Sequence, residues 1–400
     1  MPHDISALAA LMASALDRVF PAAQLQVRIG GEIVYDASFG FLDPEARARP
    51  TQATTRFDLA SVSKLFTVVA FMTLVEEGRV RLDQPVAEVL PEFCGRRPIA
   101  PYPDPLRPGR FVEIAPHTKG AVDAGAVTFR QLLSHSAGLP AWLPLWKMAA
   151  EWQRTLGPED VQRRLRETVL ATSFAYPPGA HVVYSDIGLL LIGFAIERLT
   201  GETLREVVRN RVTAPLGLDS IVYGPIPCDS AAPTEFYAHQ GRRMCGEVHD
   251  ENAFAFGGVA GHAGLFGTAH DVAAFGEALH RGLAGGHETV LRQETLAEMV
   301  HLQAQDGDVR RGLGFALRSP NPNAMSYPLG EGAFGHLGFT GTSLWVDPSR
   351  ALVLACLTNH IYYGREGEDT ITPFRAALTR TVVEWVKSAH GNRSTDPRTS

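Results

Sequence analysis

Residues 61–78 read SVSKLFTVVAFMTLVEEG, and this stretch decides how the rest of the chain is interpreted. Its apolar residues recur at the three- and four-residue spacing of a helix, and Gly78 follows them as a C-terminal cap would. We therefore predict a buried helix with Ser61 at its start. Ser61 and Lys64 are three residues apart, which places both side chains on one face of that helix.

A serine followed three residues later by a lysine can form a nucleophile and its base. A serine hydroxyl is a weak nucleophile until a neighbouring group takes its proton, and a lysine can do so when its surroundings lower its pKa. Arginine could not serve, and the chain has only four lysines among its 37 basic residues. A capping serine beside a solvated lysine would give the same spacing, so residues 61–64 alone leave that alternative open.

A second candidate segment, PPGAHVVYSD, occupies residues 177–186 and leads into an apolar helix predicted from Ile187 to Leu199. Tyr184 could move protons, and Asp186 could accept a hydrogen bond from Lys64 or from a substrate N–H group. Taken alone, Tyr184 fits better as a half-buried packing residue with its hydroxyl in water. Asp186 fits equally well as a helix N-cap.

A third segment, GHLGFTGTS at residues 335–343, comes directly before a strand-like run. Its glycines would allow a substrate to approach the backbone closely, and an edge strand here could offer a backbone N–H group to an oxyanion. A glycine-rich hairpin without a ligand is the alternative.

Strand-like and helical patterns are distributed so that both ends of the chain contribute to one α/β unit. Residues 24–29 and 32–35 predict a hairpin, residues 344–347 and 351–357 predict two strands, and residues 373–387 predict a final helix. We predict an α/β domain from residues 1–80 and 268–390, a mainly helical insertion over 81–267, and a polar tail over 391–400. The site is expected in the cleft between the two parts.

In their order, the three segments resemble the serine β-lactamase and penicillin-binding-protein superfamily, and within it the class C β-lactamase-like hydrolases and esterases. The resemblance extends over roughly residues 20–360 and includes GRVRLDQPV at 78–86 and LLSHSAGLP at 132–140. It implies a β-lactamase/transpeptidase-like fold, with an antiparallel sheet flanked by helices and a mainly helical domain.

The resemblance also implies roles for individual residues. Ser61 corresponds to the acylated serine, Lys64 to its partner and Tyr184 to the proton-shuttling tyrosine. His336 and Gly338 fall on the first and third positions of the family's Lys-Thr-Gly or His-x-Gly strand motif. The backbone N–H groups of Ser61 and Phe339 would then form the oxyanion hole.

Two positions depart from the family pattern. Asp186 stands where many relatives have asparagine, and its charge should keep Lys64 protonated, which favours Tyr184 as the base. His336 replaces the lysine that many β-lactamases place near a substrate carboxylate. Because a neutral imidazole attracts an anion weakly, neutral esters or amides become the expected substrates.

Bulk properties narrow the partners to a small molecule or a short peptide. The formal net charge is −6, which gives no basic field for nucleic acid, and no apolar run is long enough for a membrane span. The N-terminus does not resemble a signal peptide, which predicts a cytoplasmic chain. The four cysteines are far apart, so free thiols are expected.

No cofactor or metal is expected from the sequence. His249, Asp250, Glu251 and His262 could be imagined as ligands, but they lack the spacing of a helical metal motif. His135 is expected to be a structural histidine bonded to the backbone.

Three functions follow from these observations. The leading one is a serine hydrolase of the carboxylesterase or amidase type that forms an acyl-enzyme on Ser61. A D-amino-acid peptidase or β-lactamase is the second, and a non-catalytic ligand-binding member of the same fold is the third.

Overall fold

An eight-stranded antiparallel sheet organises the structure, a computed structural model that describes residues 6–391 except 105, 106, 108, 115–119, 239, 288 and 366–368. The strand order is β12-β13-β14-β15-β16-β17-β1-β2. The bounds are β1 Ala22–Ile29, β2 Glu32–Gly40, β12 Ala304–Asp306, β13 Val309–Arg311, β14 Ala316–Leu317, β15 Phe334–Leu337, β16 Ser343–Asp347 and β17 Leu352–Thr358. The N-terminal hairpin therefore joins the C-terminal strands, and the predicted antiparallel sheet is confirmed.

The β1–β2 hairpin closes at Gly30 and Gly31, as the sequence predicts. Both glycines have positive φ angles, 59° and 86°, which a two-residue turn between twisted strands requires. β1 pairs with β17 from Ala23↔Thr358 to Ile29↔Leu352, which joins the two ends of the chain. Every residue of β17 is buried, since helices cover both faces of the sheet.

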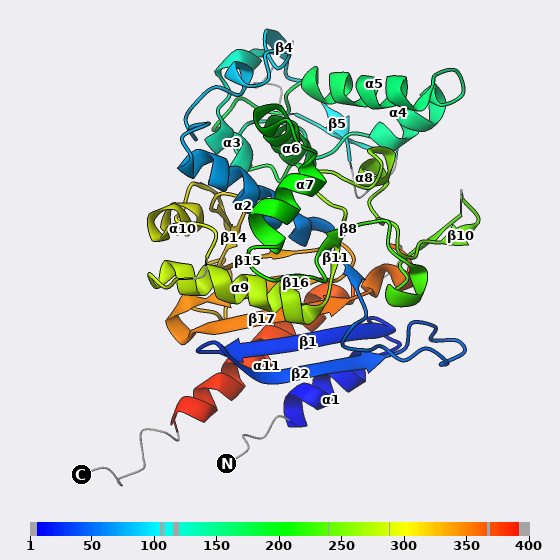
Figure 1. The fold of residues 1–400 in the computed structure, drawn as a ribbon, viewed down its shortest axis with the longest axis vertical. Coiled ribbons are helices and arrows are strands. Elements are labelled where there is room, and N and C mark those ends of the chain that lie inside the picture. Colours follow the sequence, from blue (N-terminus) through cyan, green and yellow to red (C-terminus); the bar gives the residue numbers. More distant parts are fainter. Residues whose placement is uncertain are drawn as a thin grey trace.

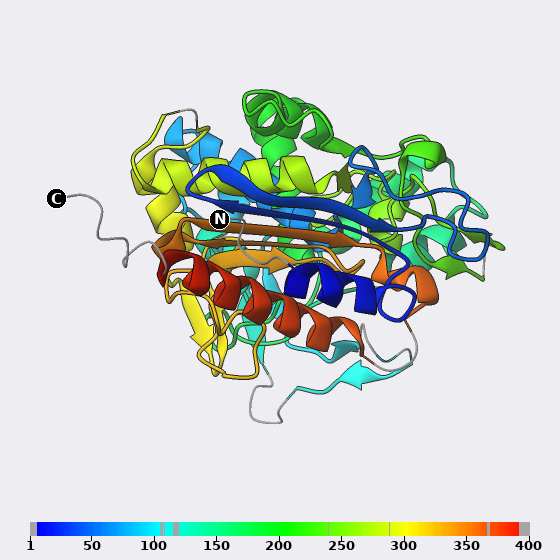
Figure 2. The same ribbon diagram turned by 90° about the horizontal axis from the view of Figure 1, so that it is seen from below.

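Two helical layers enclose the sheet (Figures 1 and 2). α1 (Ser6–Ala15) and α11 (Ile371–Gly391) lie on one face, and α9 (Ala269–Leu283) lies on the other. Each face has its own apolar core: Phe20 and Phe374 meet edge to face under α11, and Phe66 and Phe275 stack between α2 and α9.

The helical part of the molecule surrounds α2 (Ser63–Glu76), whose residues are all buried from Ser63 to Leu74. Its other helices are α3 Phe129–Leu133, α4 Leu145–Trp152, α5 Pro158–Leu170, α6 Asp186–Thr200, α7 Leu204–Val208 and α8 Glu251–Ala255, and α10 Gln293–Val300 follows α9. A helix that is apolar all round is stable only inside a protein, and α2 is covered here by α6 and α7.

Short strands also occur within the predicted helical insertion, where the sequence pattern did not reveal them. β11 (Leu265–Gly267) pairs with β8 (Val222–Tyr223) and with β3 (Phe57–Asp58), the strand just before Ser61. The others are β4 Arg96–Pro98, β5 Tyr102–Pro103, β6 Phe111–Val112, β7 Ala121–Asp123, β9 Phe236–Tyr237 and β10 Arg242–Arg243. The domain boundaries remain a prediction, and of the predicted tail 391–400 all but residue 391 lie outside the described residues.

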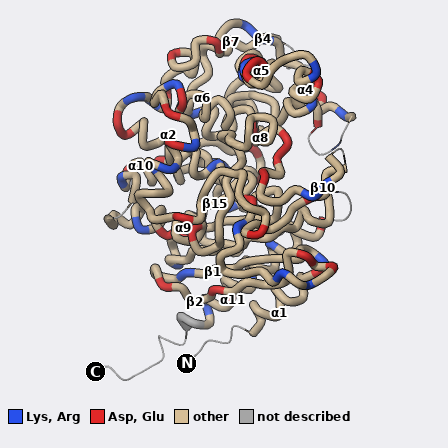
Figure 3. The backbone as a smooth tube through the Cα atoms, turned by 45° about the vertical axis from the view of Figure 1, so that its right-hand side comes forward, with Lys and Arg blue, Asp and Glu red and all other residues tan. Residues whose placement is uncertain are grey.

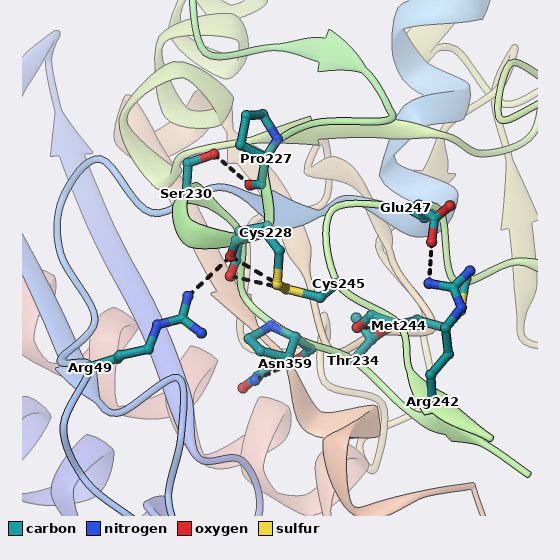
Figure 4. The surroundings of a disulfide bond; sticks show 12 residues. Arg49, Pro227, Cys228, Ser230, Thr234, Arg242, Met244, Cys245, Glu247 and Asn359 are labelled. Atoms are coloured by element: carbon teal, nitrogen blue, oxygen red, sulfur yellow. Dashed lines mark hydrogen bonds and ion pairs between the residues drawn. A yellow bond between two sulfur atoms is a disulfide. The ribbon is translucent and has the colours of Figure 1, made fainter. Parts of the chain in front are cut away.

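The expectation of four free cysteines is wrong for two of them. Cys228 and Cys245 form a disulfide with a Cα–Cα distance of 5.1 Å (Figure 4). They are 17 residues apart, and the β9–β10 hairpin between them turns the chain back on itself. Cys94 is free and exposed, and Cys356 is free and buried.

Charged residues of both signs are interspersed along the chain trace (Figure 3). Within the described ranges, no helix is both long and apolar enough to cross a bilayer.

Candidate active site

Ser61 lies in a short 3-10 turn, η1 (Ala60–Val62), that leads into α2. The residue before it, Ala60, has a φ of 46°, a left-handed conformation that is uncommon for a residue with a Cβ atom. The buried carboxylate of Asp58 supports this turn, since its Oδ1 atom accepts the N–H group of Ala60 at 2.8 Å. The fold thus holds the serine on a strained turn at the start of a buried helix.

Lys64 is 1 % exposed, and its ammonium group has three neighbours. Its Nζ atom donates to the Oγ atom of Ser61 at 2.8 Å and to the carbonyl oxygen of His262 at 3.0 Å, and it lies 2.8 Å from Oδ1 of Asp186. Burial lowers the pKa of Lys64, but the charges of Asp186 and Tyr184 outweigh it, so that the pKa is raised overall. The charged lysine predicted from Asp186 therefore has a physical cause in the structure.

Tyr184 lies directly before α6 and beside Lys64. The Nζ atom of Lys64 is 4.9 Å from the centre of the tyrosine ring. The tyrosine hydroxyl is buried and lies near Lys64 and Ser61. Burial raises the pKa of Tyr184, and the nearby Lys64 partly opposes this rise. A surface packing role with the hydroxyl in water is thereby excluded.

Ser185, not Asp186, caps α6. The Oγ atom of Ser185 accepts the N–H group of Gly188 at 3.3 Å, and Asp186 is the first residue of the helix. The N-cap alternative for Asp186 is therefore wrong, and its carboxylate is directed to Lys64 instead.

The strand that carries His336, β15, lies between β14 and β16. It is therefore not the edge strand that the sequence suggested. Two hydroxyls after this strand bond to the backbone just before Ser61. Thr340 donates to the carbonyl of Asp58 at 2.7 Å, and Thr342 donates to the carbonyl of Leu59 at 2.9 Å. These bonds fix the segment of Phe339 against the segment of Ser61, as a two-donor oxyanion hole requires.

Gly338 has no room for a side chain. A Cβ atom there would lie 2.0 Å from Oγ1 of Thr342 and 2.7 Å from the carbonyl oxygen of Leu59. The buried Arg375 of α11 holds the same loop from the opposite side, where its Nη2 atom donates to the carbonyls of Gly338 and Thr342 at 2.6 and 2.9 Å. Position 338 therefore requires glycine for steric reasons, which the sequence alone could not show.

His336 and His135 flank Tyr184, with ring centroids 5.7 and 4.8 Å from the tyrosine ring. Nδ1 of His336 lies 2.8 Å from the carbonyl oxygen of Leu337, and Nδ1 of His135 accepts the N–H group of Ser185 at 3.1 Å. Burial lowers the pKa of both imidazoles well below the usual value. Both rings are thus neutral, and His135 has the backbone bond that was expected of it.

His262 and Asp250 form a hydrogen-bonded pair behind Lys64. Nε2 of His262 lies 2.9 Å from Oδ1 of Asp250. The donor atoms of Asp186, Asp250 and His262 all lie within 4.8 Å of one another, the spacing of a metal site. The ammonium group of Lys64 already pairs with Asp186. A metal ion bound at this place would therefore be repelled by the charge of the lysine.

One residue near the site, Arg311, carried no signal in the sequence. The guanidinium carbon of Arg311 lies 5.3 Å from the ring centre of Tyr184. The exposed ring of Phe339 stacks on His249, with centroids 5.7 Å apart. Arg311 meets the site through a strand far away in the chain, so no local pattern marks it, whereas Phe339 belongs to the segment 335–343 that the sequence had singled out.

Comparisons with known proteins identify the family of the chain. Residues 6–376 match the family model described as Beta-lactamase. A protein of Escherichia coli K12 named "Putative D-alanyl-D-alanine carboxypeptidase" is 28% identical over 370 residues, which cover 86% of this chain and 79% of that protein.

Solved structures show the same fold. A penicillin-binding-protein homologue from Caulobacter crescentus has a TM-score of 0.68 at 23% identity and covers 95% of this chain and 97% of its own. EstCE1, a hydrolase with promiscuous acyltransferase activity, has a TM-score of 0.67 at 22% identity and covers 94% and 98%. The chain therefore belongs to the Beta-lactamase family, and by that membership it is a serine hydrolase of the β-lactamase and penicillin-binding-protein superfamily.

Proposed function

We propose that the protein hydrolyses a small ester or amide through an acyl-enzyme on Ser61. The observation that carries this proposal is the contact of 2.8 Å between Nζ of Lys64 and Oγ of Ser61, beside the buried hydroxyl of Tyr184. A nucleophile, a cation and a proton carrier are thus brought together from α2 and from the start of α6. The N–H groups of Ser61 and Phe339 are the proposed oxyanion donors.

The proton route follows from the charges of the site. Lys64 remains an ammonium group, because Asp186 holds its pKa up, and so it does not take the serine proton in the resting state. As Ser61 attacks the carbonyl carbon, its proton passes to Tyr184, and the proton of Tyr184 passes to the leaving oxygen or nitrogen. Water then hydrolyses the acyl-enzyme by the reverse path, so Tyr184 ends each cycle as it began.

A second function, D-amino-acid carboxypeptidase, is supported by the names of the curated relatives. The two functions share the acyl-enzyme and differ in the leaving group, which is an alcohol in an ester and an amino acid with a free carboxylate in the peptide. The lysine that binds such a carboxylate in many relatives is His336 here, which was the reason for placing neutral esters first. β-Lactam turnover remains the third possibility within this chemistry.

The experiment is intact-mass detection of the acyl-enzyme on a panel of small esters, D-peptides and β-lactams. We expect a mass increase equal to the acyl group with wild type and none with S61A, whose turnover should be abolished while its thermal unfolding is unchanged. Full activity of S61A on every accepted ester would contradict the proposal. Failure of a fluorophosphonate to label Ser61 would instead favour a ligand-binding role.

The cytoplasmic location predicted from the sequence stays a prediction, and the disulfide argues against it. Structural disulfides persist in oxidising compartments and are rare in the cytosol of most organisms.

A further inference from the structure

Arg311 is the last residue of β13, and the β12–β13 hairpin lies against the segment that carries Tyr184. Oδ2 of Asp306 on β12 lies 2.9 Å from Nδ1 of His181 and accepts the N–H group of Val182 at 3.4 Å. This contact places the Arg311 guanidinium 5.3 Å from the centre of the Tyr184 ring. β13, which is distant in sequence from Tyr184, thus places a guanidinium group beside the tyrosine ring.

The charge of Arg311 is not neutralised by the part of the chain that the structure describes. It forms no ion pair and no side-chain hydrogen bond with any of those residues, and its Nε atom is buried without a partner. Two other arginines do have hydrogen-bond acceptors. Arg375 donates to two carbonyl groups, and Arg310 donates to the carbonyl of Arg318 at 3.2 Å. A buried N–H group of a cation without an acceptor costs free energy, which a ligand anion would recover.

A second unused donor, on His135, also lies against the ring of Tyr184. Because Nδ1 of His135 accepts the N–H group of Ser185, the proton of this neutral imidazole is on Nε2. That Nε2 atom is buried and has no partner among the described residues. Burial lowers the pKa of His135, and the charge of Arg311 lowers it further, because a cation disfavours protonation of the imidazole.

We propose that Arg311, assisted by Nε2–H of His135, binds a carboxylate or a similar anionic group on the leaving side of the substrate. The leaving side is indicated by Tyr184, which Arg311 contacts and which hands its proton to the leaving group in the proposed reaction. The inference rests on the acyl-enzyme chemistry proposed above and deepens it. It also changes the expectation drawn from His336, since the missing lysine charge is replaced by an arginine from a different strand.

The test compares two phenylacetate esters that differ only in the charge of the leaving group. One carries a 3-carboxyphenyl group, and the other carries the neutral 3-carbamoylphenyl group of nearly the same shape. In R311Q we expect the ratio of kcat/KM for the charged ester to that for the neutral ester to fall about tenfold or more. R311K keeps the charge but loses the planar guanidinium group, so its ratio should lie between those of wild type and R311Q.

R310Q is the matched control, because it removes the same charge one residue away from a side chain that already has a partner. We expect its ratio to equal that of wild type. A fall in R311Q alone supports the proposal. An unchanged ratio in R311Q overturns it, and so does an equal fall in R310Q, since that would reflect only the long-range field.

The failure of this inference is separable from failure of the proposed function. If fluorophosphonate does not label Ser61 in wild type, the acyl-enzyme proposal is wrong. Binding of the two esters to S61A, measured by calorimetry, then still tests the subsite without turnover. Tighter binding of the charged ester that is lost on adding R311Q supports it, and equal binding of both esters to S61A overturns it.

Discussion

The Nζ atom of Lys64 lies 2.8 Å from Oδ1 of Asp186, an ion pair whose lysine end is almost fully buried. Taken alone, burial would discharge the lysine, and the negative charge of Asp186 reverses that tendency. The charge on Lys64 is therefore set by a residue on another helix.

Replacing Asp186 with asparagine should lower the pKa of Lys64, because the main interaction that raises it is lost while burial stays. The ionisation that belongs to Lys64 should move to lower pH in the profile of kcat/KM against pH. The profile of D186N is measured on a neutral ester whose leaving group does not titrate. If this ionisation stays in place or moves to higher pH, Asp186 does not control the charge of Lys64.

Replacing Lys64 with arginine should lower kcat by about 10²-fold or more, because the cation that contacts the nucleophile is displaced. Arginine keeps the positive charge, but it is larger than the buried lysine, so its guanidinium group cannot keep the contacts that Nζ makes with Ser61 and Asp186. K147R, at an exposed lysine on α4, is the control for the same exchange and should keep wild-type turnover. More than a tenth of wild-type kcat in K64R would contradict a specific need for lysine.

Much of the site could be predicted because its parts are local patterns. Ser61 and Lys64 are one turn apart at the start of an apolar helix, Tyr184 and Asp186 lie at the start of another, and Gly338 stands in a glycine-rich segment. Each pattern was weak alone, and their order along the chain made them a site.

The remaining contacts depend on where distant segments meet, which no local pattern encodes. Arg311 reaches Tyr184 through a hairpin, and Arg375 reaches Gly338 from the last helix. The Cys228–Cys245 disulfide depends on the two-residue strands of β9 and β10, which are too short to give a period. The edge position expected for β15 was wrong because β12, β13 and β14 extend the sheet beyond it.

Replacing Gly338 with alanine should reduce kcat while the protein still folds. The added Cβ atom would lie 2.0 Å from Oγ1 of Thr342, so the loop that carries Phe339 must move away from Leu59 and Ser61. Displacing one oxyanion donor costs about 10²- to 10³-fold in kcat. G332A, where the new Cβ would meet nothing within 4 Å, is the matched control and should be silent. Equal kcat in both variants would remove Phe339 from the proposed oxyanion hole.

Removing the disulfide should lower the free energy of unfolding by about 3 kcal/mol, as expected for a closed loop of this length. Urea unfolding of C245S against wild type measures the difference, and wild type in reductant should resemble C245S. C94S, which changes an exposed free thiol, is the control. Identical midpoints for wild type and C245S would show that the loop is held by its other contacts.

Acid should weaken the cluster beneath Phe339 through Glu235. Its carboxylate lies 2.8 Å from Nε2 of His249, which stacks on Phe339, and 2.6 Å from Nη2 of Arg365. Burial alone would raise the pKa of Glu235, but His249 and Arg365 outweigh it and lower the pKa to about 2. A carboxylate whose pKa is lowered on folding stabilises the protein above its unfolded pKa, and this contribution is lost as the pH falls towards 2.

We therefore expect wild type to lose up to about 3 kcal/mol of unfolding free energy from this group between about pH 5 and pH 2. E235Q should be less stable than wild type at pH 7, yet it should lose less stability over that interval. Urea midpoints at a series of pH values measure both effects, and E32Q, at an exposed glutamate of β2, controls for the loss of a negative charge. If the E235Q and wild-type curves run parallel from pH 7 to pH 2, the ion pairs of Glu235 do not stabilise the fold.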